Sequence, residues 1–198
     1  MMGLYTKNIE GVWFGVACDE EEIFATTFAS SKNKALQDLL RSIPFNVPFQ
    51  QFEKPSAFAE YVIAILKNVY DGIGSSQSLP LVTEHLSIYA RRVIEAVSLI
   101  PIGYVASYGL VAKVVGGSPR AVGRVMALNP FAPIVPCHRV VGSDFALGGY
   151  GGGLDVKLAF LSREKRGYNA KREIPVDGEQ LEVFPVESVL KRLERSKC

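Results

Sequence analysis

The stretch PIVPCHRVVG, residues 133–142, places a cysteine, Cys137, directly before a histidine, His138. A free cysteine has a pKa of about 8.5 and is mostly a thiol at neutral pH, so nucleophilic chemistry requires a base or a cation nearby. His138 or Arg139 could supply it. On a regular strand, adjacent side chains point to opposite faces, so His138 needs an irregular backbone or a bridging water to reach the sulfur. The alternative is a buried structural cysteine.

The cysteines and histidines do not form the pattern of a metal site. Cys18, Cys137 and Cys198 are an odd number at wide separations, which fits neither a disulfide framework nor short-spaced zinc ligands. The adjacent Cys137 and His138 lack the usual ligand spacing, and His85 has no partner near it. We therefore expect no metal, no cofactor and a reducing compartment.

Composition and length are those of an ordinary globular protein. Hydrophobic residues make up 48% and charged residues 21% of 198 residues, enough to bury a core. The longer apolar stretches, such as residues 58–66, are interrupted by charge and fall short of the ~20 residues of a membrane helix. The N-terminus lacks a basic segment leading into an apolar one, so no secretory signal is predicted. We expect a cytoplasmic protein with no membrane partner.

The net charge of +2 hides an uneven distribution. Residues 1–84 carry six Lys and Arg against ten Asp and Glu, residues 85–140 carry six against one, and residues 141–198 carry ten against nine. A middle segment with a net charge of +5 and a single acid, Glu95, is compatible with a polyanion such as nucleic acid. A solvated basic face without a partner is the alternative.

The N-terminal part combines β and helical patterns. Residues 11–18 and 23–29 are β-branched and aromatic runs separated by the acidic turn DEEE, which predicts a hairpin. Residues 32–43 and 56–70 have apolar positions at helical spacing and predict two amphipathic helices. The Gly- and Ser-rich segment 71–80 ends in proline and indicates a linker between two domains.

Three helices are predicted after the linker. Residues 84–101 have apolar steps of three and four residues, which predicts a helix of about four turns. Two shorter helices follow, the first with Ser107 as N-cap and the second with Ser118 as N-cap and Pro119 at its first position. Two short helices across a Gly-containing turn predict a helix-turn-helix, with an ordinary pair of antiparallel helices as the alternative.

The second of these short helices carries small and cationic side chains. Arg120, Ala121, Gly123 and Arg124 would let it approach a sugar-phosphate backbone closely. Glycine in a helix interior costs about 1 kcal/mol relative to alanine, so Gly123 indicates a close contact, either with DNA or with a packed neighbour.

The segments IPIGYVASYGLVA, GGSPRAVGRVMALNPF, VPCHRVV and GGYGGGLDVKLAFLSRE resemble, in order and spacing, the C-terminal domain of the methylated-DNA–protein-cysteine methyltransferases. The resemblance covers residues 85–166 and implies an α/β (α+β) fold. We expect an N-terminal mixed α/β domain with a small antiparallel sheet, and a mostly helical C-terminal domain with the helix-turn-helix and the PCHRV segment. The predicted divisions are 1–74 for the N-terminal domain, 75–84 for the linker, 85–167 for the catalytic domain and 168–198 for a C-terminal extension, in which residues 183–196 predict a short amphipathic helix.

The resemblance implies DNA repair by a single irreversible transfer. The protein would bind DNA from the minor groove and flip out the damaged guanine, and Cys137 would take the alkyl group from its 6-oxygen. Tyr108 would donate a proton to the leaving base. His138 would contact the sulfur through a water and be fixed by Glu164, and Asn129 would tie the turn after the recognition helix to the active-site segment. A helix-start aromatic, a surface glutamate and an ordinary Asn-Pro turn are the alternatives for Tyr108, Glu164 and Asn129.

The same resemblance implies a base pocket and a DNA interface. The backbone carbonyls of Cys137 and Val140 would accept from the exocyclic amine, Met126 and Tyr150 would form apolar walls, and Gly151 and Gly152 would belong to a loop that closes the pocket, unless that loop is simply flexible. Arg120 would fill the space of the extruded nucleotide or, alternatively, contact a phosphate. The DNA-binding residues are expected to be Ser107, Arg120, Ala121, Gly123 and Arg124.

The implied partner is double-stranded DNA containing alkylated guanine, bound by a monomer, with cooperative binding along DNA left open. Two other classes of protein are considered: a lesion sensor without a reactive cysteine, against which Cys137 argues, and a helix-turn-helix transcription regulator. Three positions depart from part of the family, namely Ala132 for proline, Gly151 for serine, and Arg124 for a small residue, where a stronger phosphate contact is expected.

Overall fold

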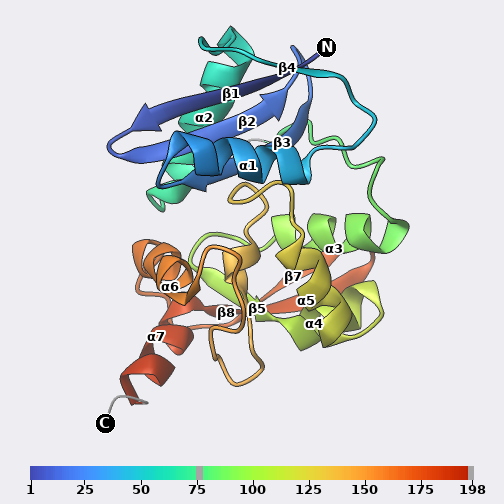
Figure 1. The fold of residues 1–198 in the computed structure, drawn as a ribbon. Helices are drawn as coiled ribbons and strands as arrows, with labels where there is room; N and C mark the ends of the chain where they lie inside the picture. The colour runs from blue at the N-terminus through green and yellow to red at the C-terminus, as the bar shows by residue number, and fades with distance from the viewer. Residues whose placement is uncertain (75–77, 196–198) are drawn as a thin grey trace. The chain divides into compact units, whose positions relative to one another are not determined.

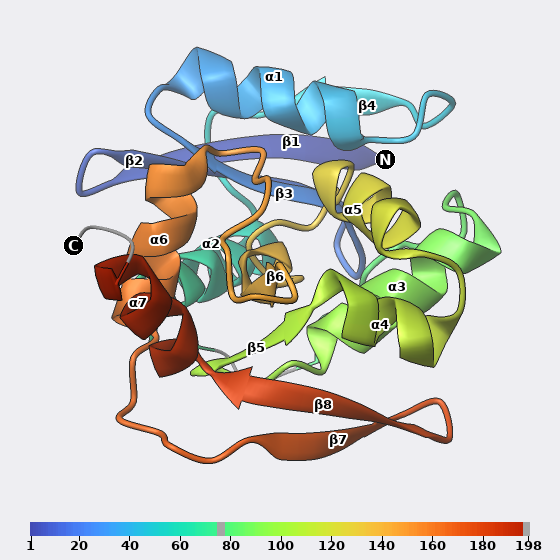
Figure 2. The ribbon, with the colours of Figure 1, turned by 90° about the horizontal axis from the view of Figure 1, so that it is seen from below.

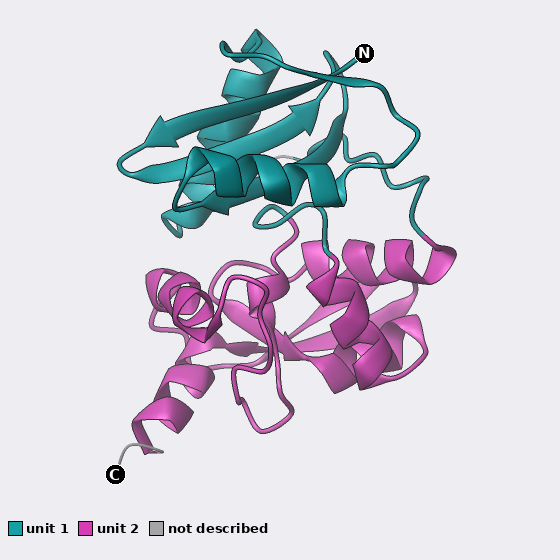
Figure 3. Cartoon of the chain, viewed as in Figure 1, with its two compact units in different colours: residues 1–86, 129–134 teal, residues 87–128, 135–198 magenta. Residues whose placement is uncertain are grey.

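The computed structural model describes residues 1–74 and 78–195 and divides into two compact units (Figure 3). Unit 1 comprises residues 1–86 and 129–134, and unit 2 comprises residues 87–128 and 135–198. Cys198 and part of the predicted linker, residues 75–77, lie outside the described residues. The predicted domain boundaries stay predictions.

Unit 1 is built on a four-stranded sheet of order β3-β2-β1-β4 (Figure 1). The predicted hairpin is confirmed, since β2 pairs antiparallel with β3 from Trp13 opposite Ala29 to Cys18 opposite Ile23. The sheet is larger than expected: β1 pairs antiparallel with β2, and the short β4 runs parallel to β1. The strands are β1 (Met2–Ile9), β2 (Val12–Cys18), β3 (Ile23–Ala29) and β4 (Phe49–Gln51).

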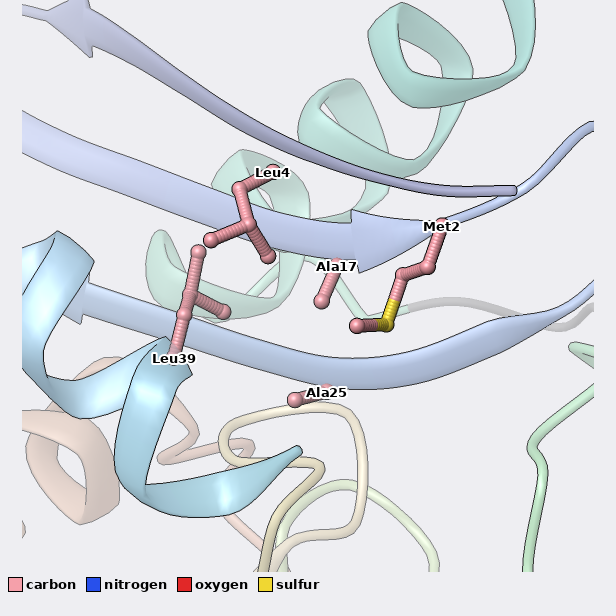
Figure 4. Packing of buried hydrophobic residues seen from close by; sticks show 5 residues of the cluster. All are labelled: Met2, Leu4, Ala17, Ala25 and Leu39. Carbon is pink, nitrogen blue, oxygen red and sulfur yellow. The ribbon is translucent and has the colours of Figure 1, made fainter. Parts of the chain in front are cut away.

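Both helices predicted in the N-terminal part are confirmed as α1 (Lys32–Ser42) and α2 (Ala57–Tyr70). Their N-cap serines, Ser31 and Ser56, each accept a hydrogen bond from a backbone amide in the first turn. The two helices cover opposite faces of the sheet (Figure 1). On the α1 face a cluster of side chains is buried, namely Met2, Leu4, Ala17, Ala25 and Leu39 (Figure 4).

Unit 2 begins with three helices, α3 (Ile88–Ser98), α4 (Tyr108–Val115) and α5 (Pro119–Ala127). The predicted start of the first helix is wrong by several residues. Ser87 caps α3, and the preceding residues form a turn in which the Leu86 amide donates to the Thr83 carbonyl. The starts of α4 and α5 are confirmed, because Ser107 and Ser118 accept from the amides of Leu110 and Ala121.

A second four-stranded sheet, of order β6-β5-β8-β7, lies in unit 2 and was not predicted. Its strands are β5 (Tyr104–Ser107), β6 (Val140–Val141), β7 (Arg172–Val176) and β8 (Glu179–Pro185), and two helices, α6 (Leu154–Arg163) and α7 (Val186–Arg195), complete the unit. Figure 2 shows the β7–β8 hairpin beside β5. The predicted C-terminal helix therefore begins later than expected, at Val186, because residues 183–185 are paired in β8.

Among the described residues, no helix has the length and apolar character needed to cross a membrane.

Candidate active site

Cys137 lies in a turn of 3-10 helix, Cys137–Arg139, and not in a regular strand. The turn begins after Pro136, whose carbonyl accepts from the Arg139 amide at 2.8 Å. The Val140 amide donates to the carbonyl of Cys137, and β6 starts there. This is the irregular backbone that the adjacent Cys137 and His138 required, since the alternation of a strand does not apply to it.

Cys137 contributes to the wall of a cavity of about 430 Å³ in unit 2, although its side chain is only 6% exposed. Among the residues predicted for the base pocket, Met126, Tyr150 and Gly151 line this cavity, whereas Val140 and Gly152 are not among its lining residues. The complete lining is Tyr108, Pro119, Gly123, Met126, Ala127, Cys137, Gly149, Tyr150 and Gly151. The cavity thus joins the cysteine to the α5 helix and to the glycine-rich loop.

His138 is completely buried and bonded to Glu164, with 2.8 Å between its Nε2 and the Glu164 Oε1. Arg139 approaches the same carboxylate as a fork, with Nε donating to Oε2 and Nη2 donating to Oε1, both at 2.9 Å. The Nη1 of Arg139 donates to the carbonyl of Ile100 at 2.6 Å. Arg139 therefore forms an ion pair with Glu164, a contact that the sequence did not reveal.

Burial and neighbouring polar groups determine the protonation states of Glu164 and His138. Burial would raise the pKa of Glu164, but the hydrogen bonds from His138 and Arg139 and the positive charge of Arg139 outweigh it and lower that pKa to about 2. Burial lowers the pKa of His138, and the charges of Arg139 and Lys157 lower it further, against the opposing effect of Glu164. A neutral histidine beside an ionised carboxylate follows.

The neutral ring of His138 has a defined tautomer. Because Nε2 faces a carboxylate, which only accepts, Nε2 carries the proton and Nδ1 is the basic nitrogen. Among the described residues, Nδ1 has no hydrogen-bond partner. The ring stacks on Phe160 of α6, with centroids 4.6 Å apart, which fixes its plane. His138 is therefore oriented as a base with Nδ1 able to accept a proton.

Two tyrosines face the cysteine. Burial, followed by the negative charge of Cys137, raises the pKa of Tyr108, so its hydroxyl is protonated and donates to the Gly149 carbonyl at 3.3 Å. Burial also raises the pKa of Tyr150, and its hydroxyl shares a hydrogen bond with the side chain of Cys137. Tyr150 was expected only as an apolar wall, so this polar contact is new.

Lys157 is a site residue that the sequence prediction missed. Its side chain is fully buried, and its Nζ donates to the Val140 carbonyl at 2.6 Å and lies 5.7 Å from the centre of the Tyr108 ring. Burial lowers the pKa of Lys157 to about 8, against the negative charge of Cys137, which raises it. The signal in the sequence was its helical spacing to Phe160 and Leu161, which puts a lysine on the buried face of α6.

The Val140 carbonyl already accepts from Lys157, and the Cys137 carbonyl accepts from the Val140 amide. Each carbonyl oxygen has a second lone pair, so each could also accept a hydrogen bond from the exocyclic amine of a guanine, as predicted.

The predicted DNA-binding residues lie on the helix-turn-helix of α4 and α5. Arg120 and Arg124 are exposed, and the Ser107 hydroxyl is engaged as the N-cap of α4. A Cβ added at Gly123 would meet only the Cε1 of Tyr108, at 3.9 Å. Packing therefore does not require glycine at this position. Ala121 is half-buried beside it.

Asn129 lies in the turn after α5, where its Oδ1 accepts from the Phe131 amide at 3.0 Å. Its expected tie to the active-site segment stays a prediction.

No three His, Cys, Asp or Glu side chains gather closely enough to hold a metal ion in the part of the chain that the structure describes.

The site combines a cysteine in the wall of a cavity, a histidine bonded to a carboxylate, and a helix-turn-helix whose second helix lines the same cavity. This combination indicates a reactive thiol in a nucleic-acid-binding protein. Residues 89–166 match the family model described as 6-O-methylguanine DNA methyltransferase, DNA binding domain. Over this segment the chain is similar to the methylated-DNA–protein-cysteine methyltransferases, and solved structures of such proteins share its fold.

Relatives and solved structures of this family cover the chain to different extents. The methylated-DNA–protein-cysteine methyltransferase of Pyrobaculum aerophilum is 60% identical over 65 residues, which are 33% of this chain and 44% of that protein. The O6-methylguanine-DNA methyltransferase structure from Pyrococcus kodakaraensis is 28% identical and covers 83% of this chain and 99% of its own, with a TM-score of 0.61. The Mycobacterium tuberculosis OGT structure in complex with DNA is 28% identical and covers 82% and 92%, with a TM-score of 0.66. The sequence match spans about half the length of the curated relatives.

Proposed function

We propose that this protein repairs DNA by moving an alkyl group from the 6-oxygen of a damaged guanine to the sulfur of Cys137, once per molecule. The observation that carries the proposal is the position of Cys137 in a cavity whose wall also includes Gly123 and Met126 of the predicted recognition helix α5. A DNA base that enters this cavity would meet the sulfur directly. The names of the relatives, methylated-DNA–protein-cysteine methyltransferase, support transfer of a methyl group from DNA to a protein cysteine.

The DNA would be held by the helix-turn-helix. Arg120 lies in the first turn of α5, is exposed, and is expected to take the place of the extruded nucleotide. Extrusion of a base costs a few kcal/mol, and an alkylated guanine, whose pairing is weakened, costs less than a normal one. The M. tuberculosis neighbour is described as a complex with DNA, which supports double-stranded DNA as the partner here.

The sulfur would attack as a thiolate. The Cys137 proton passes through a water to Nδ1 of His138, the nitrogen that Glu164 leaves basic by holding Nε2. The ammonium group of Lys157 interacts favourably with a negative charge on Cys137, so it stabilises the thiolate. These two residues supply the base and the cation that the reaction requires.

The transfer step forms one bond and breaks one. The Cys137 sulfur attacks the alkyl carbon, the bond from that carbon to the guanine 6-oxygen breaks, and its electron pair stays with the base. Tyr108, which is protonated at neutral pH, gives a proton to the ring and neutralises the developing charge. The thioether that remains on Cys137 has no good leaving group, so each molecule reacts once.

The proposal is tested with a duplex that carries a labelled methyl group on one guanine. The protein is expected to acquire the label, and Cys137→Ser is expected to lose the transfer while binding the duplex with similar affinity, because a serine hydroxyl is scarcely ionised at neutral pH. An undamaged duplex of the same sequence should compete poorly. Binding that follows the sequence of the duplex and ignores the lesion, with no label transferred, would instead indicate a transcription regulator.

A further inference from the structure

The C-terminal extension lies outside the segment that matches the family model, yet it is part of the structure around the active site. Strand β8 pairs antiparallel with β5, with Tyr104 opposite Pro185 and Val105 opposite Phe184. At the start of α7, the Val186 amide donates to the carbonyl of Gly103 at 2.9 Å. Strand β5 runs directly into Ser107 and Tyr108, so the extension holds the strand that leads to the predicted proton donor (Figure 2).

Helix α7 also fills the core beneath the active-site turn. Val186 and Val189 are fully buried in a cluster with Val105 of β5, Val141 of β6 and Leu161 of α6. Val141 follows the turn that carries Cys137 and His138, and Leu161 precedes Glu164 by three residues. The extension therefore contacts each of the segments that position the reactive group.

Glu187 makes the most specific of these contacts. Its side chain comes from the first turn of α7 and is only 8% exposed, and its Oε1 accepts from the amides of Arg166 at 3.1 Å and Gly167 at 2.5 Å. These amides lie two and three residues after Glu164. Among the described residues, the other oxygen of Glu187 has no partner, a situation that typically costs about 1–3 kcal/mol. An apolar side chain would avoid that cost but would release the two amides.

We propose that Glu187 is a positioning residue for the transfer reaction. By fixing the backbone that follows Glu164, it keeps the carboxylate of Glu164 in contact with both Nε2 of His138 and the fork of Arg139. The inference rests on the proposed function, because the reaction that it serves is the attack by Cys137. It assigns to the extension a part in catalysis in addition to its part in folding.

The experiment compares Glu187→Ala with a matched control on the same helix, Glu194→Ala, where the glutamate is exposed. Two rates are measured: methyl transfer at saturating duplex, and alkylation of Cys137 by iodoacetamide, followed by the mass of the peptide that contains Cys137. In a single-turnover protein the end point counts the reactive molecules, and the rate constant describes how each of them reacts. We expect Glu187→Ala to lower both rate constants about tenfold, since displacement of a catalytic group by a fraction of an ångström has effects of this order. Glu194→Ala should leave both unchanged.

The pH dependence separates positioning from stability. The charged groups that act on His138 are Glu164, Arg139 and Lys157, and Glu164 is the one that raises its pKa. A loosened Glu164 raises that pKa less, so the acid limb of the rate profile should move to lower pH in Glu187→Ala. Glu187→Gln should react at nearly the wild-type rate, because its amide oxygen still accepts from both backbone amides.

Unchanged rate constants and an unchanged pH profile in Glu187→Ala, with only a smaller end point or a lower melting temperature, would overturn the proposal. If that variant does not fold, Glu187→Asp decides in its place, because the shorter side chain keeps its charge but does not reach both amides; slow transfer is expected, and a wild-type rate constant would overturn the proposal. If the wild type takes no methyl group from DNA, the proposed function fails, and the iodoacetamide rates still report whether Glu187 acts on Cys137.

Discussion

The buried carboxylate of Glu164 accepts hydrogen bonds from two side chains, His138 and Arg139. Sequence motifs could indicate the residue types, because Cys137 and His138 are adjacent and Glu164 stands at the family's spacing. They could not indicate that Arg139 would turn toward Glu164, since the direction of a side chain in a 3-10 turn depends on contacts with α6 and with the Ile100 carbonyl. The burial of Lys157 could have been predicted from its spacing to Phe160 and Leu161, but its partners could not, because they are backbone carbonyls that carry no sequence signal.

The ion pair of Glu164 predicts an acid-sensitive stability. Its pKa is lowered from 4.5 to about 2 on folding, so its contribution is fully present above pH 4.5 and is lost as the pH falls toward 2. A shift of this size corresponds to about 3 kcal/mol in the free energy of unfolding. Urea denaturation between pH 6 and pH 2 should show this loss in the wild type and lack it in Glu164→Gln, which is less stable throughout. An equal pH dependence in the two proteins would contradict the assignment.

Lys157 is predicted to set the pH at which Cys137 reacts. Its ammonium group stabilises a negative charge on the sulfur, and Lys157→Met keeps the length of the side chain without the charge. The pH of half-maximal iodoacetamide reactivity of Cys137 should rise by about one unit, which corresponds to about 1.4 kcal/mol. Lys191→Met, at an exposed position on α7, should not move it. A midpoint that stays in place in Lys157→Met would exclude this role.

At the scale of secondary structure, the helices could be predicted and much of the second sheet could not. Helices α4 and α5 can be predicted from local sequence, because Ser107 and Ser118 cap their starts and glycines lie between them. Strands β5 and β6 are four and two residues long, and they become strands only because β5 pairs with β6 on one side and with β8 on the other. Such pairing over long sequence distances leaves little trace in local periodicity.

Helix α5 offers a test in which stability and function change in opposite directions. A methyl group at Gly123 has space, because the nearest atom is the Cε1 of Tyr108 at 3.9 Å, and alanine favours a helix over glycine. Gly123→Ala should therefore raise the free energy of unfolding by about 0.5–1 kcal/mol. It should slow transfer from duplex DNA, which must approach this face, and leave the iodoacetamide rate of Cys137 unchanged. A stabilised variant that repairs the duplex at the wild-type rate would show that Gly123 does not face DNA.

The two exposed arginines of α5 are expected to act differently. Arg120→Ala should slow transfer at saturating duplex by tenfold or more, as expected when an interaction of about 1.4 kcal/mol or more is lost at the flipping step, and change the reaction with free O6-methylguanine much less. Arg124→Ala should weaken duplex binding without changing the transfer rate at saturating duplex. The slope of the logarithm of the binding constant against the logarithm of the salt concentration should decrease in magnitude by about one. Equal losses on duplex and free base in Arg120→Ala would contradict a role in flipping.

At the scale of the whole molecule, the structure revises the meaning of the charge distribution. One of the six cations in residues 85–140 is Arg139, which is buried on Glu164 and adds nothing to an outer surface. Another, Arg92, pairs with Asp177 in the hairpin turn between β7 and β8, at 3.3 Å. The basic character of the helix-turn-helix itself rests on Lys113, Arg120 and Arg124. Net charge along the sequence pointed toward nucleic acid, but only the fold shows which cations are exposed.

The C-terminal extension also takes its meaning from the whole molecule. In the sequence, residues 168–198 followed the last family motif and offered only an amphipathic helix. In the structure, β7, β8 and α7 complete the sheet and the core of unit 2. Because the burial of Val186 and Val189 depends on β5, β6 and α6, the part played by the extension could not be predicted from its own residues.

A single alkyl transfer to Cys137 can be measured by titrating the intact protein with duplex DNA that carries O6-methylguanine and determining the mass of the product. We expect a plateau at about one added methyl group per reactive molecule, located on Cys137 by peptide mapping and absent from Cys18, whose pKa is raised to about 12 by burial and by Asp19. Excess substrate should give no further product. Repeated turnover, or a methyl group found on another residue, would contradict a single transfer to Cys137.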